Sequence, residues 1–245
     1  SMATRARSCA LSSSGYRSNS PNRNGTATVS IYVQRGTLWP TPGAVDGAAL
    51  WRRADIGVML TPASGRRTGV VGGGSRFAVD TGCFRHPESF DLGAYLSYLE
   101  WLAPHAGRCL FATAPDTVAD WPATWAKSES VLPRIRALGL CAALVAQDGL
   151  ALGAVPWEAF DCLFVGGSTG FKLAETTYAL VREATARGKW THQGRCNSWQ
   201  RLKAAHQGGY ASADGTCLAW NPPQYAAEIA GWLDRLTAQP HLELW

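Results

Sequence analysis

A repeated pattern of short apolar runs, each stopped by a polar residue or a glycine, constrains this chain more than any other feature. It is clearest in YASADGT, where the run from Tyr210 to Ala213 ends in Asp214 and Gly215 follows at once. Glycine lets the backbone turn sharply there, so the pattern is that of a strand delivering an acid to the rim of a sheet. Five further runs end in the same way, at Asp80, Asp116, Gln147 with Asp148, Gly166–Gly167 and His192. Parallel strands of an α/β protein carry their ligands and their chemistry at these carboxyl ends.

Segments that could be helical separate most of the runs, and this alternation predicts the fold class. We expect strands at Thr28–Val33, Ile56–Leu60, Arg76–Val79, Cys109–Ala114, Leu140–Ala146, Cys162–Val165, Lys189–His192 and Tyr210–Ala213. We expect helices at Leu92–Leu102, Val118–Leu138, Phe171–Arg187, Ser198–Gln207 and Gln224–Leu236. The 245-residue length and the eight expected strands predict an α/β fold, a single-domain (β/α)8 barrel of the TIM type over residues 28–245. A doubly wound sheet is the competing topology.

Charge is distributed unevenly along the chain. The net charge is +5, and the residues before Asp46 contain five arginines and neither an acid nor a lysine. The rest of the chain is therefore neutral, and we predict a basic, flexible N-terminal arm over residues 1–27. Such an arm suits the phosphate backbone of a nucleic acid. A solvated tail rich in Ser, Asn and Arg explains the same composition equally well.

The segment TPASGRRTGVVGGGSR, after the second expected strand, is rich in glycine and arginine. It is not a Walker loop, because no Gly-Lys-Ser/Thr closes it. Arg66, Arg67 and Arg76 could contact the phosphates of a nucleic acid, as a mobile lid or a phosphate-binding loop. A solvated hairpin loop is the alternative interpretation.

Cysteine spacing and hydropathy argue against a metal site and against a membrane location. The seven cysteines are scattered without a C-x-x-C pair, so neither a zinc site nor any other metal site is predicted. The chain has no run of about 18 apolar residues, so no segment is expected to span a membrane. Its start lacks the apolar core of a signal peptide, which indicates a cytoplasmic protein.

Carboxylates at the expected strand ends suit substitution at a sugar carbon. Asp80 and Asp214 could divide the roles of nucleophile and general acid/base. Asp116 and Gln147 carry acceptors and donors that match a purine edge. Gly166–Gly167 would let a flat ligand approach the backbone closely. A single Asp at a strand end is more often a helix cap or a turn former, so the coincidence of six such ends is what favours a site.

These strand ends lie within longer motifs by which the chain resembles a known family. WTHQGRCNSWQRLKAAHQGGYASADGT and FAVDTGCF are the most specific motifs, and FATAPD, ALVAQDG and FVGGSTGFK support them. From about Phe77 to Asn221, the chain resembles the bacteriophage-type 7-deazaguanine DNA transglycosylases, which are relatives of the tRNA-guanine transglycosylases. The resemblance implies a (β/α)8 glycosyltransferase that exchanges guanine in DNA for a 7-deazaguanine base through a covalent aspartyl-sugar intermediate. It implies no metal or redox cofactor, and a location in the host cytoplasm if the source is a phage.

The resemblance also implies a role for each matching residue. Asp214 would be the nucleophile at the anomeric carbon of the sugar, and Asp80 would be the acid/base for the proton of the base. Asp116, Gln147 and the Gly166–Gly167 backbone would hold the guanine or deazaguanine. Structural support or backbone contact around the substrate would come from the segment before the nucleophile, at His192, Gly194, Arg195 and Asn197.

Two departures from the tRNA enzymes shape this interpretation. Those enzymes carry a Cys-x-Cys-x-x-Cys and His zinc site after the nucleophile. This chain lacks these residues, so we expect no zinc subdomain and favour DNA over tRNA as the partner. Their acid/base loop usually reads Asp-Ser-Gly-Gly-Phe, whereas the segment from Asp80 to Phe84 reads DTGCF and keeps the aspartate and the first glycine. A tRNA-guanine transglycosylase, a glycoside or nucleoside hydrolase on the same barrel, and a non-catalytic nucleic-acid-binding relative stay open as alternatives.

Overall fold

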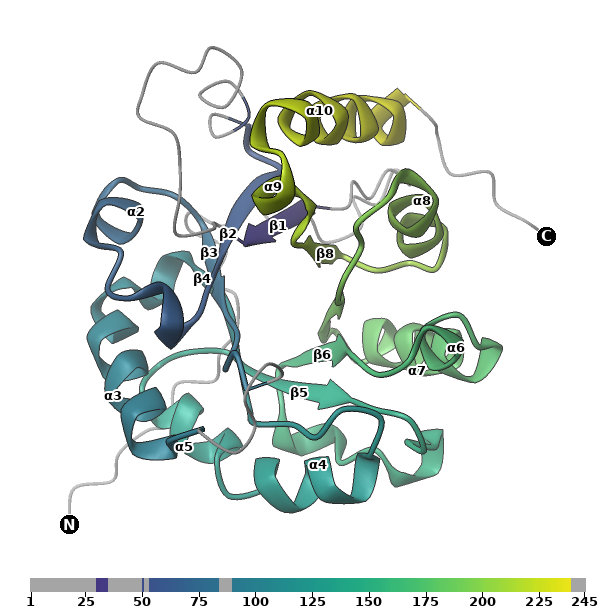
Figure 1. Ribbon diagram of the computed structural model, residues 1–245. Helices are drawn as coiled ribbons and strands as arrows, with labels where there is room; N and C mark the ends of the chain where they lie inside the picture. Colours follow the sequence, from purple (N-terminus) through teal and green to yellow (C-terminus); the bar gives the residue numbers. More distant parts are fainter. Residues whose placement is uncertain (1–29, 35–49, 51–52, 84–89, 239–245) are drawn as a thin grey trace.

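Eight parallel strands form a closed barrel in chain order, with β1 pairing with both β2 and β8. The computed structural model describes residues 30–34, 50, 53–83 and 90–238, and Figure 1 shows the strands around the centre with the helices outside them. This confirms the predicted single-domain (β/α)8 barrel and excludes the doubly wound sheet. The strands are β1 (Ser30–Gln34), β2 (Ile56–Leu60), β3 (Phe77–Val79), β4 (Cys109–Thr113), β5 (Ala142–Ala146), β6 (Cys162–Val165), β7 (Trp190–Gln193) and β8 (Ser212–Gly215).

Helices connect most of these strands and cover the outside of the barrel (Figure 1). The α-helices are α2 (Thr68–Gly72), α3 (Leu92–Leu102), α4 (Trp121–Ser128), α5 (Leu132–Ala137), α6 (Thr169–Lys172), α7 (Glu175–Ala186), α8 (Trp199–Gln207), α9 (Cys217–Trp220) and α10 (Pro222–Ala238). Short 3-10 helices are η1 (Pro62–Ser64), η3 (Ala103–Arg108), η4 (Leu152–Ala154) and η5 (Trp157–Ala159). None of the helices in the described ranges is long and apolar enough to cross a membrane.

The side chains of the strands alternate between two apolar cores, because successive residues of a strand point to opposite faces. The larger core lies between the barrel and the helices and contains Val58, Leu60 and Val79 among many others. The smaller core fills the inside of the barrel. It consists of Met59, Ala78, Leu110, Phe111, Ala143 and Cys162. The barrel interior is thus packed with side chains, which leaves its end as the place for a ligand.

Polar side chains fix the first turns of several helices. Asp91 accepts a hydrogen bond from the backbone N–H of Ala94 and thereby caps α3. Asp120 caps α4 in the same way, and Ser198 caps α8. Each cap satisfies a backbone N–H group that has no partner within its helix. These caps set where each helix begins after the loop from the preceding strand.

Several boundaries differ from the sequence predictions. The expected strand Tyr210–Ala213 is shifted, because β8 runs from Ser212 to Gly215 and includes Asp214. The single helix predicted over Phe171–Arg187 is two helices, α6 and α7, separated by Leu173 and Ala174. The helix predicted over Val118–Leu138 is likewise divided into α4 and α5.

Proline explains why the helix predicted over Val118–Leu138 is divided into α4 and α5. Pro122 and Pro133 lie in the first turns of α4 and α5, where the missing N–H of proline removes no helical hydrogen bond. They therefore start two helices rather than interrupt one.

The segment predicted as a loop after β2 also contains η1 and α2, so the simple hairpin interpretation is wrong. The basic arm over residues 1–27 lies outside the described residues.

Candidate functional site

Three carboxylates meet at the carboxyl ends of the strands. Asp80 directly follows β3, Asp116 follows β4 after two residues, and Asp214 lies near the end of β8. Because all strands run in the same direction, these residues share one end of the barrel. They also interact electrostatically, since both Asp116 and Asp214 raise the pKa of Asp80. The structure thus brings together the acids that the sequence placed at strand ends.

Asp80 has the properties of a group that exchanges protons near neutral pH. Burial is the largest cause that raises its pKa, followed by the charges of Asp116 and Asp214, and the pKa reaches about 7. The hydroxyl of Thr113 opposes this shift by donating a hydrogen bond to Oδ1 at 3.2 Å. A carboxyl group with a pKa near the working pH is suited to general acid and base catalysis.

Asp214 is held by two donors and is only 6% exposed. The backbone N–H of Arg195 donates to its Oδ1 at 3.2 Å, and Nε2 of His192 lies 3.3 Å from the same oxygen. Within the described part of the chain, no hydrogen bond reaches Oδ2. Asp214 is therefore oriented through one oxygen, and the other is available to form a bond.

A relay of hydrogen bonds determines which nitrogen of His192 carries the proton. The indole N–H of Trp190 donates to Oγ of Ser212 at 2.7 Å, and this hydroxyl lies 2.7 Å from Nδ1 of His192. The carboxylate of Asp214 can only accept, so Nε2–H of the neutral ring donates to Asp214. Nδ1 then accepts from the hydroxyl of Ser212, which itself accepts from the indole N–H of Trp190. Burial lowers the pKa of His192, which favours this neutral form. His192 is completely buried and thus supports Asp214 rather than contacting a substrate.

Asp116 and Gln147 form a polar pair beside the acids. Nε2 of Gln147 donates to Oδ2 of Asp116 at 2.6 Å, while its Oε1 accepts from the backbone N–H of Ala119 at 2.9 Å. The thiol of Cys83 donates to Oδ1 of Asp116 at 3.2 Å. Burial is the main cause that raises the pKa of Asp116. The alternative role as a helix cap is wrong for Asp116, because Asp120 caps α4.

Gly166 and Gly167 are needed for close packing at the end of β6. A Cβ atom on Gly166 would lie 2.7 Å from Nε2 of Gln147, and one on Gly167 would lie 2.5 Å from Oδ2 of Asp148. Gly167 also has a φ of +77°, a conformation that other residues rarely adopt. These glycines let the backbone pass directly beside the pair of Asp116 and Gln147.

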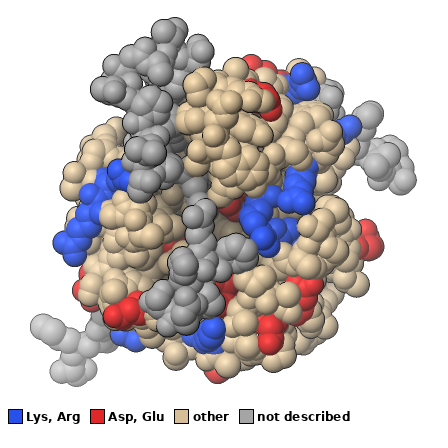
Figure 2. All heavy atoms as spheres, in the orientation of Figure 1, with Lys and Arg blue, Asp and Glu red and all other residues tan. Residues whose placement is uncertain are grey.

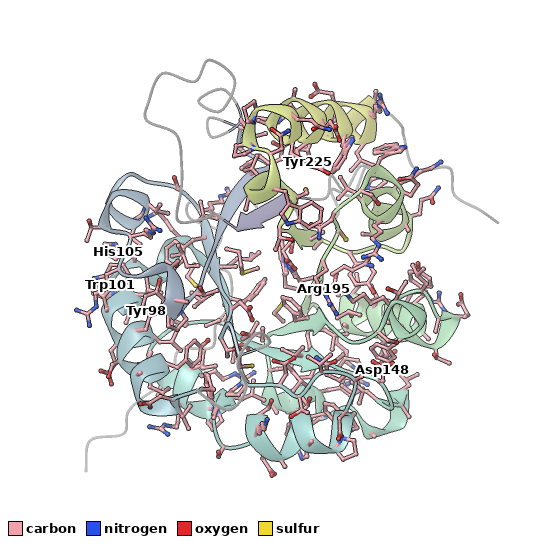
Figure 3. All side chains as sticks on the ribbon, in the orientation of Figure 1. Tyr98, Trp101, His105, Asp148, Arg195 and Tyr225 are labelled. Atoms are coloured by element: carbon pink, nitrogen blue, oxygen red, sulfur yellow. The ribbon has the colours of Figure 1, made fainter. Side chains whose placement is uncertain are left out.

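Arg195 joins two loops of the site in an uncommon backbone conformation. Its φ is +62°, and conformations of this kind cost about 1–3 kcal/mol in residues other than glycine. Its guanidinium donates to the carbonyl oxygen of Gly167 at 3.0 Å, while its backbone N–H holds Asp214. Figure 3 shows Arg195 toward the centre of the ring of helices, with Asp148 farther out.

Asn197 fastens the backbone that follows β8. Its Oδ1 accepts from the backbone N–H groups of Thr216 at 2.6 Å and Cys217 at 3.1 Å, and its Nδ2 donates to Oγ1 of Thr216. A Cβ atom on Gly215 would lie 2.8 Å from the same Oδ1. Asn197 is therefore a support of the strand that carries Asp214.

The three arginines predicted to contact nucleic acid lie in the connection from β2 to β3. Arg66 and Arg67 lie between η1 and α2. The guanidinium of Arg66 lies 5.8 Å from the ring centroid of Trp101, which Figure 3 labels on α3. Arg76 directly precedes β3 and so lies at the end of the barrel opposite the acids. Contact of the three arginines with a nucleic acid stays a prediction.

Lys172 is a buried cation beside the acids, and the sequence motifs did not predict it as a site residue. Its side chain is only 5% exposed, and Nζ donates to the carbonyl oxygen of Gly194 at 2.8 Å. Burial and then the charge of Arg195 lower its pKa to about 8, while Asp214 opposes the shift. The signal in the sequence was the lysine at the end of FVGGSTGFK, five residues after Gly167.

Comparisons with known proteins agree with the architecture. No family model matches the chain, and no curated protein matches its sequence. A tryptophan synthase structure from M. tuberculosis is 14% identical, with a TM-score of 0.55, over 89% of this chain and 94% of that one. The fold is a TIM barrel.

Two other solved structures share this fold. One is described as native KDPGal; it is 12% identical over 85% of this chain and 96% of that chain, with a TM-score of 0.53. A putative isomerase from Sinorhizobium meliloti is 12% identical over 82% of this chain and 54% of that chain, with a TM-score of 0.52. Similarity at this level of identity concerns the fold alone, and the chemistry has to be argued from the residues of this TIM barrel.

Proposed function

We propose that this TIM barrel is a glycosyltransferase that exchanges guanine in DNA for a 7-deazaguanine base. The observation that carries the proposal is the pairing of two different acids at one barrel end. Asp214 is oriented by N–H donors through a single oxygen, and the pKa of Asp80 is raised to about 7. One group is thus suited to attack a sugar carbon and the other to move a proton. The motif resemblance described above assigns the same two roles.

The first half-reaction removes guanine from the sugar. Oδ2 of Asp214 forms a bond to the anomeric carbon as the bond from that carbon to the guanine nitrogen breaks. The bonding electrons leave with guanine, and the protonated carboxyl of Asp80 supplies the proton that makes guanine a neutral leaving group. The sugar then remains attached to Asp214 as an ester.

The second half-reaction reverses these steps with a different base. The ionised Asp80 takes a proton from the ring nitrogen of the incoming deazaguanine. That nitrogen attacks the anomeric carbon and displaces Asp214 with its electron pair. A pKa of about 7 lets Asp80 serve both half-reactions at neutral pH, because neither form is strongly favoured.

Asp116 and Gln147 support recognition of a guanine-like base. The carboxylate of Asp116 offers acceptors to the N1–H and the exocyclic amino group of guanine, and Gln147 orients it at 2.6 Å. Burial strengthens a hydrogen bond between a carboxylate and such donors. A base without the amino group would make one hydrogen bond fewer to Asp116.

A nucleic-acid partner is supported by the positions of the cations. Figure 2 shows Lys and Arg atoms over α2 and α3 on one side and beside α6 and α8 on another. Arg66, near Trp101, belongs to the first group. A guanine in a duplex would have to leave the stack to reach the acids, at a cost of a few kcal/mol.

An exchange assay with labelled guanine tests this proposal. Wild-type protein is incubated with DNA and labelled free guanine, and a parallel reaction contains tRNA. We expect label to enter DNA, and we expect Asp214→Ala to abolish incorporation while its melting curve stays cooperative. Release of guanine without incorporation would indicate a hydrolase on the same barrel, and incorporation into tRNA alone would reassign the partner. Incorporation by a folded Asp214→Ala protein would refute the role of Asp214.

A further inference from the structure

A second cationic group lies beside the acids, on the side of α6 and α8. Arg201 belongs to the first turn of α8, and its side chain is exposed. Its guanidinium donates to the carbonyl oxygen of Arg195 at 3.2 Å and lies 3.4 Å from Oγ1 of Thr169. Figure 2 shows Lys and Arg atoms gathered here, around the position at which Figure 3 labels Arg195. Arg201 is thus held against the backbone segment that orients Asp214.

The positive charges in this group repel one another. Arg195 and Arg201 both lower the pKa of Lys172, whereas Asp214 raises it. In the described part of the chain, Asp148 is a second acid within electrostatic reach: burial raises its pKa, and hydrogen bonds from Ser168 and the charge of Lys172 lower it. Among the described residues, the ion pairs include neither Lys172 nor Arg201. Three cations therefore face two carboxylates, and a bound anion would offset the remaining repulsion.

We propose that Arg201 binds a phosphodiester group of the substrate strand, next to the nucleotide whose sugar meets Asp214. The inference rests on the proposed function, because it takes a nucleotide at Asp214 as its reference point. Two of the five guanidinium N–H groups of Arg201 are used by the protein, which leaves others for phosphate oxygens. The planar guanidinium matches the geometry of a phosphate.

The position of Arg201 gives this contact a mechanistic consequence. Arg201 holds the carbonyl oxygen of Arg195, and the N–H of the same residue holds Oδ1 of Asp214. Only the backbone of Arg195 would therefore separate a phosphate bound to Arg201 from the N–H group that orients Asp214. It would fix the sugar relative to Asp214 and would favour a polynucleotide over a free nucleoside.

Binding measurements on modified oligonucleotides test this contact. Fluorescence anisotropy gives the Kd for an oligonucleotide that contains one guanine, and for versions in which one phosphate at a time is replaced by an uncharged methylphosphonate. We expect Arg201→Ala to weaken binding of the parent oligonucleotide by about tenfold, the size of a lost charge-assisted contact. The slope of log Kd against log salt should fall by about one. One methylphosphonate next to the guanine should remove this difference between wild type and variant.

Controls separate this contact from general effects. Arg182→Ala removes an exposed arginine that pairs with Glu175 on α7, and it should leave DNA binding unchanged. Arg201→Gln keeps a long polar side chain and should lose affinity like Arg201→Ala if charge is the cause. Melting curves establish that each variant is folded.

The outcomes distinguish this inference from the proposed function. Equal Kd values for wild type and Arg201→Ala would overturn the inference, as would a loss that no single methylphosphonate abolishes, or an absence of oligonucleotide binding. Because binding is measured without an added base, it does not depend on exchange. Coupling between Arg201 and one phosphate, in a protein that exchanges no base, would contradict the proposed function and leave the phosphate contact standing.

Discussion

Asp80 should make the folded protein less stable at neutral pH than an uncharged residue would. A carboxyl group whose pKa rises from 3.8 to about 7 on folding binds its proton more tightly in the folded state than in the unfolded chain. The cost to folding is therefore absent below about pH 4, grows between pH 4 and pH 7, and is constant above pH 7. Asp80→Asn removes this cost, because an amide stays neutral and keeps the Oδ1 that accepts from Thr113.

The size of the effect follows from the shift in pKa. Each unit corresponds to about 1.4 kcal/mol, so the full shift would correspond to about 4 kcal/mol of unfolding free energy above pH 7. Asp80 keeps some exposure to solvent, and solvent screening reduces this value. We expect Asp80→Asn to be more stable than wild type by about 2 kcal/mol at pH 8, with a gain that falls toward zero near pH 4. Exchange activity should be lost at every pH.

Urea unfolding of both proteins at several pH values between 4 and 8.5 measures this difference. Asp120→Asn is the matched control, because Asp120 caps α4 on the surface and asparagine caps a helix equally well. The control should change stability by less than about 0.5 kcal/mol. If Asp80→Asn were no more stable than wild type at pH 8, or if its gain were the same at pH 4, the assignment of Asp80 as the proton-exchanging acid would be wrong.

Three further changes test other parts of the site. The exchange rate of the wild type should fall near pH 8, because the pKa of Lys172 is lowered to about 8. Lys172→Arg should remove this fall, because arginine stays charged. An unchanged pH–rate profile would deny Lys172 an electrostatic role. Gly166→Ala would place Cβ 2.7 Å from Nε2 of Gln147, so KM for the free base should rise by about tenfold. Gly153→Ala is the control and should leave KM unchanged, because no atom of the described residues lies within 4 Å of the new Cβ. Asp116→Asn sets a donor against the donors of guanine, and titration of free bases should show a loss of about one to two decades in affinity, smaller for purines without the amino group. Equal affinities would remove Asp116 from the base-binding site.

The sequence predicted the barrel because each strand is a short apolar run with a clear end. β2 and β6 begin and end at the predicted residues, since helices cover one face and side chains fill the other. The carboxylates could be predicted to meet for the same reason, as parallel strands end on one side. The position of Arg76 at the end of the barrel opposite Asp80 could also have been inferred, because one residue precedes β3 and the other follows it.

Other features depend on contacts between distant segments, which local patterns do not contain. β8 includes Asp214 because Tyr32 of β1 lies opposite it in the register of the barrel, and no local pattern fixes that register. The burial of Lys172 requires the carbonyl oxygen of Gly194, which belongs to the loop after the next strand. The relay through Ser212 to His192 joins β7 and β8, and its members are ordinary strand residues in the sequence.

Mass spectrometry of nucleosides tests the central claim most directly. DNA is incubated with the wild-type protein and a free 7-deazaguanine base, then purified and digested to nucleosides. The account predicts a 7-deazaguanine deoxynucleoside in the digest, an equal amount of released guanine in the supernatant, and neither product with Asp214→Ala. Unmodified DNA after incubation with a folded, DNA-binding wild-type protein and a series of 7-deazaguanine bases would contradict the account.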